Sequence, residues 1–389
     1  MNSYKNVEVL GQVFTPEYIV AEMLQLRKNY GNVLEPSAGE GAFSSKIDNC
    51  TSIEIDAKYA PLNTLNIDFF DYPVTNKFDT VIGNPPYVKF KDIQKSTKNK
   101  LKSIIFDERS NLYLFFIEKC IKHLKNNGEL IFITPRDFLK ATSSIKLNEF
   151  LFKNGTITDL IELGDKKIFN GYSPNCIIWR FEKNNFSRKT NITKQFILNN
   201  GQLLFTKEIY PIEFNKLFMV KVGAVSGNDK IFSSEKYGNE EFVYSATNRT
   251  GQTKKMIFNV KNKYLEKYKE ELINRKIKKF DDFNWWKWGR LHYISNKKRI
   301  YVNCKTRVKN PFFIHKCKNY DGSVLAIFPL NQKLDIISLC NNLNSVDWFE
   351  LGFVCDGRYI FSQKSLENTM LPVFFNKFAI ENSMLDFSP

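Results

Sequence analysis

The chain has 389 residues, of which 43% are hydrophobic, 15% aromatic and 25% charged. This length exceeds that of a typical single domain and predicts two. No apolar run approaches the roughly 20 residues of a membrane span. The first residues also lack the basic start and apolar stretch of a signal peptide, so we expect a soluble, cytoplasmic protein.

The formal net charge of +16 is carried mainly by the second half of the chain. Residues 1–180 contain 23 Lys and Arg against 21 Asp and Glu, whereas residues 181–389 contain 34 against 20. A compositional bias of the genome would affect both halves. The excess therefore predicts a polyanionic partner for the second half, with nucleic acid as the first candidate. A merely soluble basic surface is the alternative.

The seven cysteines are odd in number, no two form a Cys-x-x-Cys pair, and there are only three histidines. We expect reduced thiols that serve mostly as packing residues. The segment 304–317, with His315 between two cysteines, is the one place to look for zinc ligands. We predict no metal site.

Between residues 32 and 181, short apolar runs alternate with helical stretches. Strands are predicted at 32–36, 50–56, 64–67, 78–83, 129–135, 156–163 and 175–181. Helices are predicted at 43–48, 111–125 and 145–152, of which the second has apolar residues at a helical period. This alternation predicts a mostly parallel sheet with helices on both faces. Ligands of such sheets bind beyond the carboxyl ends of the strands.

The chain changes character after this region. Residues 183–193 are polar and indicate a linker. From about residue 197 the sequence shows no clear periodicity. It mixes short strands, basic helical patches such as 264–279 and an aromatic cluster at 285–288.

The first three predicted strand ends carry residues suited to a nucleoside. Gly39 and Gly41 follow the first strand, where glycines let a ligand approach the backbone and a helix N-terminus offers free N–H groups. Glu54 ends the second strand, at a distance from the glycines that suits a ribose diol. Asp68 and Phe69 follow the third, and suit the exocyclic amine and the face of an adenine. The fourth strand ends in Asn-Pro-Pro-Tyr at 84–87.

This series of blocks resembles the gamma-type DNA N6-adenine methyltransferases of restriction-modification systems, which carry an Asn-Pro-Pro-Tyr motif. The blocks are GQVFTP (11–16), LEPSAGEGAF (34–43), SIEID (52–56), NIDFFDYP (66–73), FDTVIGNPPY (78–87), the unit 110–139 and ELGDKKIF (162–169). The resemblance covers about residues 9–182. It implies an α/β, Rossmann-like, seven-stranded S-adenosylmethionine-dependent methyltransferase domain at 1–182. A linker at 183–196 and a basic, mixed α+β target-recognition domain at 197–389 would follow.

The resemblance also implies roles for individual residues. S-adenosylmethionine would be the cofactor, contacted by Thr15, Glu35, Gly39, Gly41, Glu54, Asp68, Phe69 and Asn84. A flipped-out target adenine would be held by the catalytic residues Asn84, Pro85, Pro86 and Tyr87, with Tyr87 and Phe169 stacking on the base. Ser37 and Glu40 are not diagnostic of the family and are not predicted contacts.

The tetrapeptide suits the methylation of an amine. The Asn84 side-chain oxygen and the Pro85 carbonyl can accept the two hydrogens of the amine, which directs its lone pair at the sulfonium methyl. The same oxygens stabilise the positive charge that develops on nitrogen. The prolines restrict φ and bias Asn84 away from helical geometry, so the direction of the carbonyl is set in advance.

Other functions share parts of this pattern. RNA or protein-glutamine amino methyltransferases use the same tetrapeptide, but they resemble the chain only in its first half. A fused restriction nuclease is suggested by Glu-Ile-Asp-Ala-Lys at 54–58, without a convincing partner acid. A DNA-binding module that has lost activity would not need the intact Asn84. Cytosine methylases usually carry Ser in place of Asn84, or a Pro-Cys pair that is missing here.

Double-stranded DNA is the predicted partner of the basic second half. Side chains that reach base edges read sequence, while cations on phosphates supply affinity. The predicted DNA contacts are Lys95, Lys98, Lys100, Arg290, Asn303 and Arg307. The alternative is that the neighbouring tryptophans belong to a core and the cations are solvated. A cognate restriction endonuclease is a candidate partner, and one chain carrying both domains is expected to work as a monomer.

Overall fold

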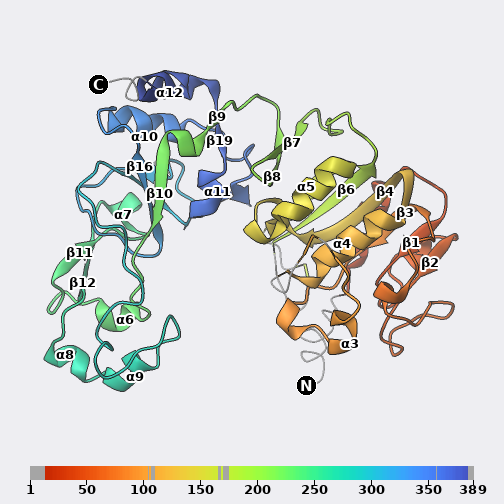
Figure 1. Cartoon of the computed structure of the whole chain (residues 1–389), viewed down its shortest axis with the longest axis horizontal. Coiled ribbons are helices and arrows are strands. Elements are labelled where there is room, and N and C mark those ends of the chain that lie inside the picture. The colour runs from red at the N-terminus through yellow and green to blue at the C-terminus, as the bar shows by residue number, and fades with distance from the viewer. Residues whose placement is uncertain are drawn as a thin grey trace. The chain divides into compact units, whose positions relative to one another are not determined.

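The computed structural model describes residues 14–103, 105–106, 110–164, 168–169, 175–355 and 357–383. The chain divides into two compact units, Met1–Lys207 and Glu208–Pro389, both of which can be followed in Figure 1. Over the described ranges, no helix is both long enough and apolar enough to cross a membrane.

The first unit is built around a six-stranded sheet with the strand order β2-β1-β3-β4-β6-β5. Its strands are β1 (Val33–Glu35), β2 (Cys50–Ser52), β3 (Phe78–Gly83), β4 (Leu124–Pro135), β5 (Gly155–Glu162) and β6 (Cys176–Lys183). β1 to β4 pair in parallel, and β6 runs antiparallel between β4 and β5. The expected Rossmann-like α/β fold is confirmed.

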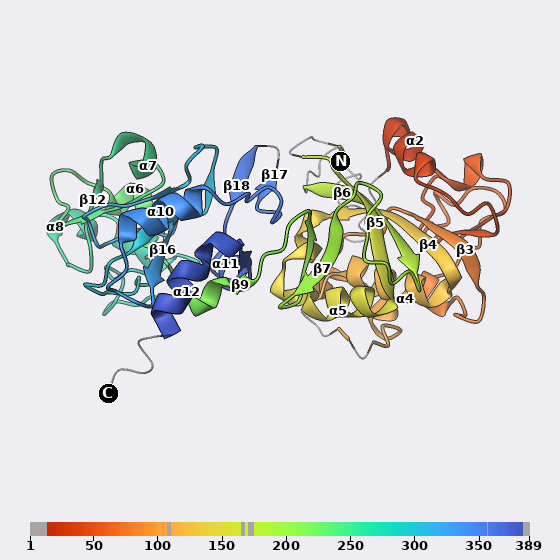
Figure 2. The same cartoon turned by 90° about the horizontal axis from the view of Figure 1, so that it is seen from above.

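Helices cover this sheet and explain why its central strands are apolar on both faces. They are α2 (Glu17–Gln25), α3 (Lys95–Lys98), α4 (Leu112–His123) and α5 (Ile145–Asn154). In Figure 2, α4 and α5 lie along one side of the sheet and α2 on the other. α4 begins where the Asn111 side chain accepts the Tyr113 N–H, which satisfies one of the free donors at a helix start.

Two predicted elements are reduced to a single bridge and a single turn. The strand expected at 64–67 is reduced to one parallel bridge between Leu65 and Ile53, because the Ile67 N–H turns back to the Leu65 carbonyl instead of continuing the ladder. The helix expected at 43–48 is a single 3-10 turn, Ser44–Lys46, which ends at the extended Ile47.

The predicted linker is part of the first unit. Residues 183–196 lead into the hairpin of β7 (Gln195–Asn199) and β8 (Gln202–Thr206). The Asn191 N–H donates to the Thr158 carbonyl of β5 (2.8 Å), and the Asn148 amide donates to Gly201 in the hairpin (2.8 Å). The boundary between the units therefore follows Lys207.

The second unit has mixed α+β structure, as expected. Its main sheet is antiparallel, with the order β10-β16-β13-β15. Its strands are β9 (Ile212–Glu213), β10 (Phe218–Val222), β11 (Glu240–Phe242), β12 (Lys254–Met256), β13 (Ile300–Asn303), β14 (Lys305–Thr306), β15 (Phe312–Phe313), β16 (Val324–Pro329), β17 (Val354–Cys355), β18 (Arg358–Ile360) and β19 (Met370–Leu371). Its helices are α6 (Asp229–Phe232), α7 (Thr247–Thr250), α8 (Lys263–Glu266), α9 (Lys269–Ile273), α10 (Ile336–Asn344), α11 (Gln363–Glu367) and α12 (Asn376–Ser383).

The aromatic cluster at 285–288 belongs to the core of this unit. Trp285 and Trp288 are each 1% exposed and pack with Phe232 and Phe242. The Trp288 indole donates to the Ile257 carbonyl (2.8 Å). Trp285 and Trp288 therefore belong to the core, which was the alternative to their being exposed beside bound DNA.

Candidate active site

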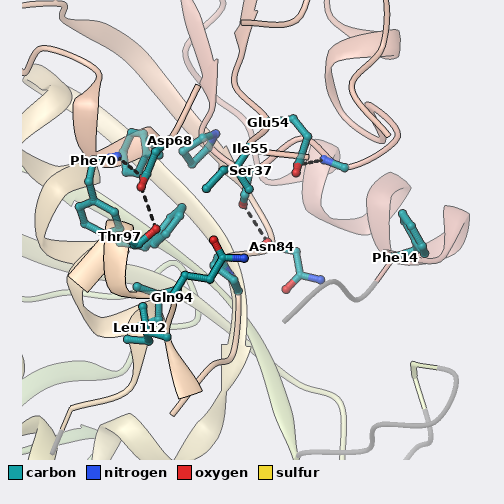
Figure 3. Close-up of a pocket in the computed structure, with 16 residues that line it drawn as sticks. Phe14, Ser37, Glu54, Ile55, Asp68, Phe70, Asn84, Gln94, Thr97 and Leu112 are labelled. Atoms are coloured by element: carbon teal, nitrogen blue, oxygen red, sulfur yellow. Dashed lines mark hydrogen bonds between the residues drawn. The ribbon is translucent and has the colours of Figure 1, made fainter. Parts of the chain in front are cut away.

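A pocket lies beyond the carboxyl ends of β1, β2 and β3, at the edge where an α/β sheet binds its ligands. The space free of protein atoms measures about 810 Å³, part of it open solvent. The predicted site residues that line it are Gly39, Glu54, Asp68, Phe69, Asn84 and Pro86. Figure 3 shows how its labelled side chains are arranged.

The glycine loop after β1 uses its two glycines differently. Gly39 and Gly41 both have positive φ angles, +54° and +79°, a conformation that favours glycine. The Gly39 N–H donates to Glu54 Oε2 (2.7 Å), which joins the loop to the end of β2 (Figure 3). Gly41 is not among the lining residues; a Cβ there would come within 2.8 Å of Pro61 Cγ. The close approach to Pro61 gives Gly41 a role in the turn, and its predicted contact with the cofactor stays a prediction.

Glu35 lies behind the pocket wall instead of in it. Its carboxylate accepts the backbone N–H groups of Phe43 (3.3 Å) and Ser44 (2.8 Å), and the residue is 1% exposed. Burial raises the pKa of Glu35 to about 7. Glu35 thus supports the glycine loop from within, and its predicted contact with the cofactor stays a prediction.

Both carboxylate oxygens of Glu54 accept backbone N–H groups, and its contact with a ribose stays a prediction. Oε2 faces Gly39, and Oε1 accepts the Asp56 N–H (2.9 Å). Each carboxylate oxygen can accept more than one hydrogen bond, so ligand hydroxyls can still bind. The nuclease-like stretch 54–58 makes contacts within its own segment. The Lys58 ammonium lies over the Tyr59 ring, and the Lys58 backbone N–H donates to Asp56.

Asp68 is held by a segment that follows the catalytic motif. Its Oδ1 accepts the Phe70 N–H (2.9 Å), and its Oδ2 accepts the Thr97 hydroxyl (2.8 Å), as Figure 3 shows. Lys100 Nζ lies 3.4 Å from the same Oδ2 and forms a shorter ion pair with Asp71. Lys100, predicted to contact DNA, is thus engaged at the cofactor pocket.

Lys119 fixes the turn that presents Asp68 and Phe69. Its ammonium donates to the Phe69 carbonyl (2.7 Å) and lies 4.9 Å from the centre of the Phe69 ring. Burial lowers the pKa of Lys119 to about 8. Lys119 belongs to α4, so this helix helps to position the turn that carries Asp68 and Phe69.

Asn84 is held at several points. Its Nδ2 donates to Thr15 Oγ1 (3.2 Å) and its Oδ1 accepts from the Tyr87 hydroxyl (2.5 Å). Its backbone carbonyl accepts from the Ser37 hydroxyl (3.1 Å, Figure 3). The predicted contact residue Thr15 thus touches the catalytic amide. The pocket lining does not include Thr15 or Pro85.

Tyr87 and Phe169 meet, but neither ring lies open in the pocket. Tyr87 is 8% and Phe169 3% exposed, and their ring centres are 6.3 Å apart. The Tyr87 hydroxyl also lies 2.8 Å from the Ile133 carbonyl of β4. The structure therefore shows a hydroxyl contact to Asn84 that the sequence did not suggest, while the stacking of both rings on a base stays a prediction. Residues 165–167 of the block that ends in Phe169, and residues 11–13 of GQVFTP, lie outside the described residues.

Several lining residues were not predicted from the sequence. They are Phe14, Pro36, Ser37, Ile55, Phe70, Ile93, Gln94, Thr97, Leu112 and Phe116. Phe14 and Ser37 lie inside blocks that carried the resemblance, so proximity to Thr15 and Gly39 was an available signal. Gln94 and Thr97 come from a polar segment whose sequence gives no sign that it reaches the pocket.

The other predicted DNA contacts have mixed surroundings. Lys95 is exposed on α3, and Lys98 donates to the Lys91 carbonyl (3.1 Å). Arg290 is exposed, yet its guanidinium donates to the Gly223 carbonyl (3.1 and 3.2 Å). Asn303 is buried, and Arg307 is exposed.

The curated relatives of this chain are methyltransferases. Residues 30–169 match the family model described as the Eco57I restriction-modification methylase. The resemblance to restriction-modification methyltransferases is therefore confirmed at the level of the class, and S-adenosylmethionine is the cofactor that this class implies. The gamma-type subdivision stays a prediction.

Individual relatives show how far the similarity extends. The Type II methyltransferase M.HindII of Haemophilus influenzae is 27% identical over 92% of this chain and 88% of the relative. M.HincII of Haemophilus influenzae is 34% identical, but over only 45% of this chain and 37% of the relative. The Type IIL restriction-modification enzyme MmeI, solved in complex with DNA, has a TM-score of 0.59 at 12% identity, covering 90% of this chain and 64% of MmeI. That likeness shows a shared fold.

Proposed function

We propose that this chain is the DNA methyltransferase of a restriction-modification system and transfers a methyl group to N6 of an adenine. The observation that carries the proposal is the placement of Asn84-Pro85-Pro86-Tyr87 at the end of β3, beside the carboxylates Glu54 and Asp68. The basic second half and the restriction-modification names of the relatives support DNA as the substrate.

The pocket residues fit S-adenosylmethionine by their chemistry. Glu54 and Asp68 place two acceptors on the same wall, suited to ribose hydroxyls and to an adenine amine, with Phe69 beside them. The bound cofactor supplies an electrophilic methyl group on a sulfonium. The carboxylates and the glycine loop would orient it toward Asn84.

Asn84 and Pro85 would activate the target amine. The N6 lone pair of adenine is delocalised into the ring, so the amine is a poor nucleophile. The Asn84 side-chain oxygen and the Pro85 carbonyl would accept its two hydrogens, localise the lone pair and stabilise the charge that develops on nitrogen. Alignment of the two reacting groups supplies much of the remaining acceleration.

The target base must leave the duplex before it reaches these acceptors. Flipping a base costs a few kcal/mol, and stacking on an aromatic ring returns roughly 1–3 kcal/mol. Tyr87 and Phe169 are the proposed stacking partners, since they are in contact beside Asn84.

The test is methyl transfer from labelled S-adenosylmethionine to duplex DNA, followed by digestion to nucleosides. We expect the label in N6-methyladenine. Asn84→Ala should abolish transfer while cofactor binding persists. Label in cytosine, or no label in DNA from a protein that binds the cofactor, would contradict the proposal.

RNA and a glutamine-containing protein substrate are the competing acceptors. Parallel reactions with total RNA and with a cell extract freed of nucleic acid distinguish them from duplex DNA. Transfer to either in preference to DNA would replace the proposed substrate without changing the chemistry at Asn84.

A further inference from the structure

A second pocket lies within the second unit, between two basic segments. One wall is formed by residues 245–249, around the start of α7, and the other by residues 303–308, from β13 through β14. The space measures about 740 Å³, much of it open to solvent. Its lining includes the cations Arg249, Lys305 and Arg307, and none of the described lining residues is acidic.

Two asparagine side chains join these walls at different points. Asn303 Nδ2 donates to the Ser245 carbonyl (2.7 Å). Asn248 Nδ2 donates to the carbonyls of Asn310 (3.1 Å) and Pro311 (3.3 Å), just beyond the second wall. The cations are therefore carried by two segments whose spacing is set before any ligand binds, which reduces the entropy lost on binding.

Two of the three lysine and arginine side chains that line this pocket have no ion pair among the described residues. Arg249 and Lys305 are exposed, and within the part of the chain that the structure describes neither forms an ion pair. Lys254 of the same unit is different, because it lies 3.0 Å from both Asp229 and Asp321. Uncompensated cations in a concave site attract an anion.

The pocket also contains a buried polar group that lacks a partner. Asn303 is 3% exposed, and among the described residues its Oδ1 accepts no hydrogen bond. The bond from Nδ2 to Ser245 fixes the amide, so the orphan atom is an acceptor. A phosphate offers no donor to it. The atom exposes less than 1 Å², so it lies behind the pocket surface and is not itself a ligand of the phosphate.

We propose that this pocket binds the phosphodiester backbone of the DNA substrate. Arg249 and Lys305 are the phosphate ligands. The inference rests on the proposed function, which makes DNA the polyanion. It assigns the pocket a positioning role in DNA binding, because phosphate contacts set register and carry no sequence information of their own.

The experiment measures the affinity of the full-length protein for a labelled mixed-sequence duplex as salt is varied. The association constant K falls as salt rises, so a plot of log K against log salt concentration has a negative slope. Each lost phosphate contact makes this slope shallower by about 0.9 and weakens binding roughly 10-fold at about 0.1 M salt. The double variant Arg249→Gln, Lys305→Gln should therefore lose about 2 from the slope. Its affinity should approach that of the unchanged protein as salt rises.

Lys364→Gln is the matched control. It removes one positive charge from the same unit at a lysine that is already paired with Glu367 (3.2 Å), and its slope should stay that of the unchanged protein. Cofactor binding and the midpoint of thermal unfolding report that the double variant is folded.

An unchanged slope and affinity in the double variant would overturn the inference, as would an equal loss in Lys364→Gln. A loss confined to single-stranded RNA of the same length would assign the pocket to RNA, and would also overturn it. Methyl transfer by the unchanged protein is measured separately. If that protein transfers no methyl to DNA, the proposed function fails, whereas transfer combined with an unaltered slope in the double variant refutes only the phosphate pocket.

Discussion

Tyr87→Phe separates two roles of Tyr87, because it removes the hydroxyl and keeps the ring. The hydroxyl lies 2.5 Å from Asn84 Oδ1 and 2.8 Å from the Ile133 carbonyl. It carries one proton, and the shorter contact is the one to Asn84. The other end of the Asn84 amide donates to Thr15. The hydroxyl therefore fixes which way the Asn84 oxygen points, while stacking on the base is the role proposed for the ring.

The magnitude follows from the contacts that are lost. A buried hydrogen bond contributes about 0.5–1.5 kcal/mol net, and a partner left unsatisfied costs about 1–3 kcal/mol. If the loss falls on the orientation of Asn84 during transfer, each 1.36 kcal/mol lowers the rate about tenfold. We expect kcat to fall roughly 10- to 100-fold, with the affinity for cofactor unchanged.

Single-turnover methyl transfer at saturating DNA and cofactor measures this rate. A duplex with 2-aminopurine at the target position reports flipping by fluorescence, and Tyr87→Phe should retain the signal. Tyr87→Leu removes the ring as well and should lose it. Tyr301→Phe, which deletes a buried hydroxyl bonded to the Cys317 carbonyl (2.7 Å) in the second unit, should leave kcat unaltered. A normal kcat in Tyr87→Phe would refute the positioning role of the hydroxyl.

Three other changes test the first unit. Thr97→Val removes a hydrogen bond to the Asp68 carboxylate, worth about 1.5–3 kcal/mol, so calorimetry should show cofactor affinity reduced at least about tenfold, with Thr97→Ser restoring it. Glu35 has a pKa of about 7 when folded against 4.5 ordinarily. The unfolded chain therefore loses this proton first as pH rises, and about 3 kcal/mol of stability is lost between pH 4.5 and 7. Glu35→Gln should remove that loss in urea unfolding of the ligand-free protein, and an unchanged pH slope would argue against it. Arg180→Met leaves Glu129 buried and unpaired and should cost about 3–5 kcal/mol in the same assay; a smaller loss would mean that Glu129 is neutralised in another way.

The strands of the first sheet were predictable because burial on both faces requires unbroken apolar runs. β3 and β4 show this directly, with Val81, Ile82 and Ile131 all fully buried. The shortened strand at Leu65 and the ordered segment around Asn191 were not predictable in the same way. The strand is shortened by a local turn from Ile67 back to Leu65, and the segment around Asn191 is fixed by a backbone bond to the distant Thr158. Neither interaction leaves a periodic apolar pattern in the sequence.

The site was predictable where topology alone places a residue. Glu54, Asp68 and Asn84 follow parallel strands or the bridge beside them, so they had to meet at one edge of the sheet. Glu35 also follows this rule, yet its side chain turns inward to the backbone of Ser44. The direction of a side chain at a strand end depends on the loop beyond it, and the sequence does not encode that direction locally.

Lys100 has a consequence for the order in which ligands act. It bonds to Asp68 at the cofactor pocket and belongs to the same short segment as the exposed Lys95. If DNA binds residues 95–100, the contact between Lys100 and Asp68 changes. If the cofactor binds to Asp68, the same contact changes and the segment 95–100 is held differently. Linkage requires the effect to be reciprocal: if DNA alters the affinity for cofactor by some factor, the cofactor alters the affinity for DNA by the same factor. We therefore expect the ternary complex to assemble cooperatively, and Lys100→Gln to weaken that coupling more than it weakens the binding of either ligand alone.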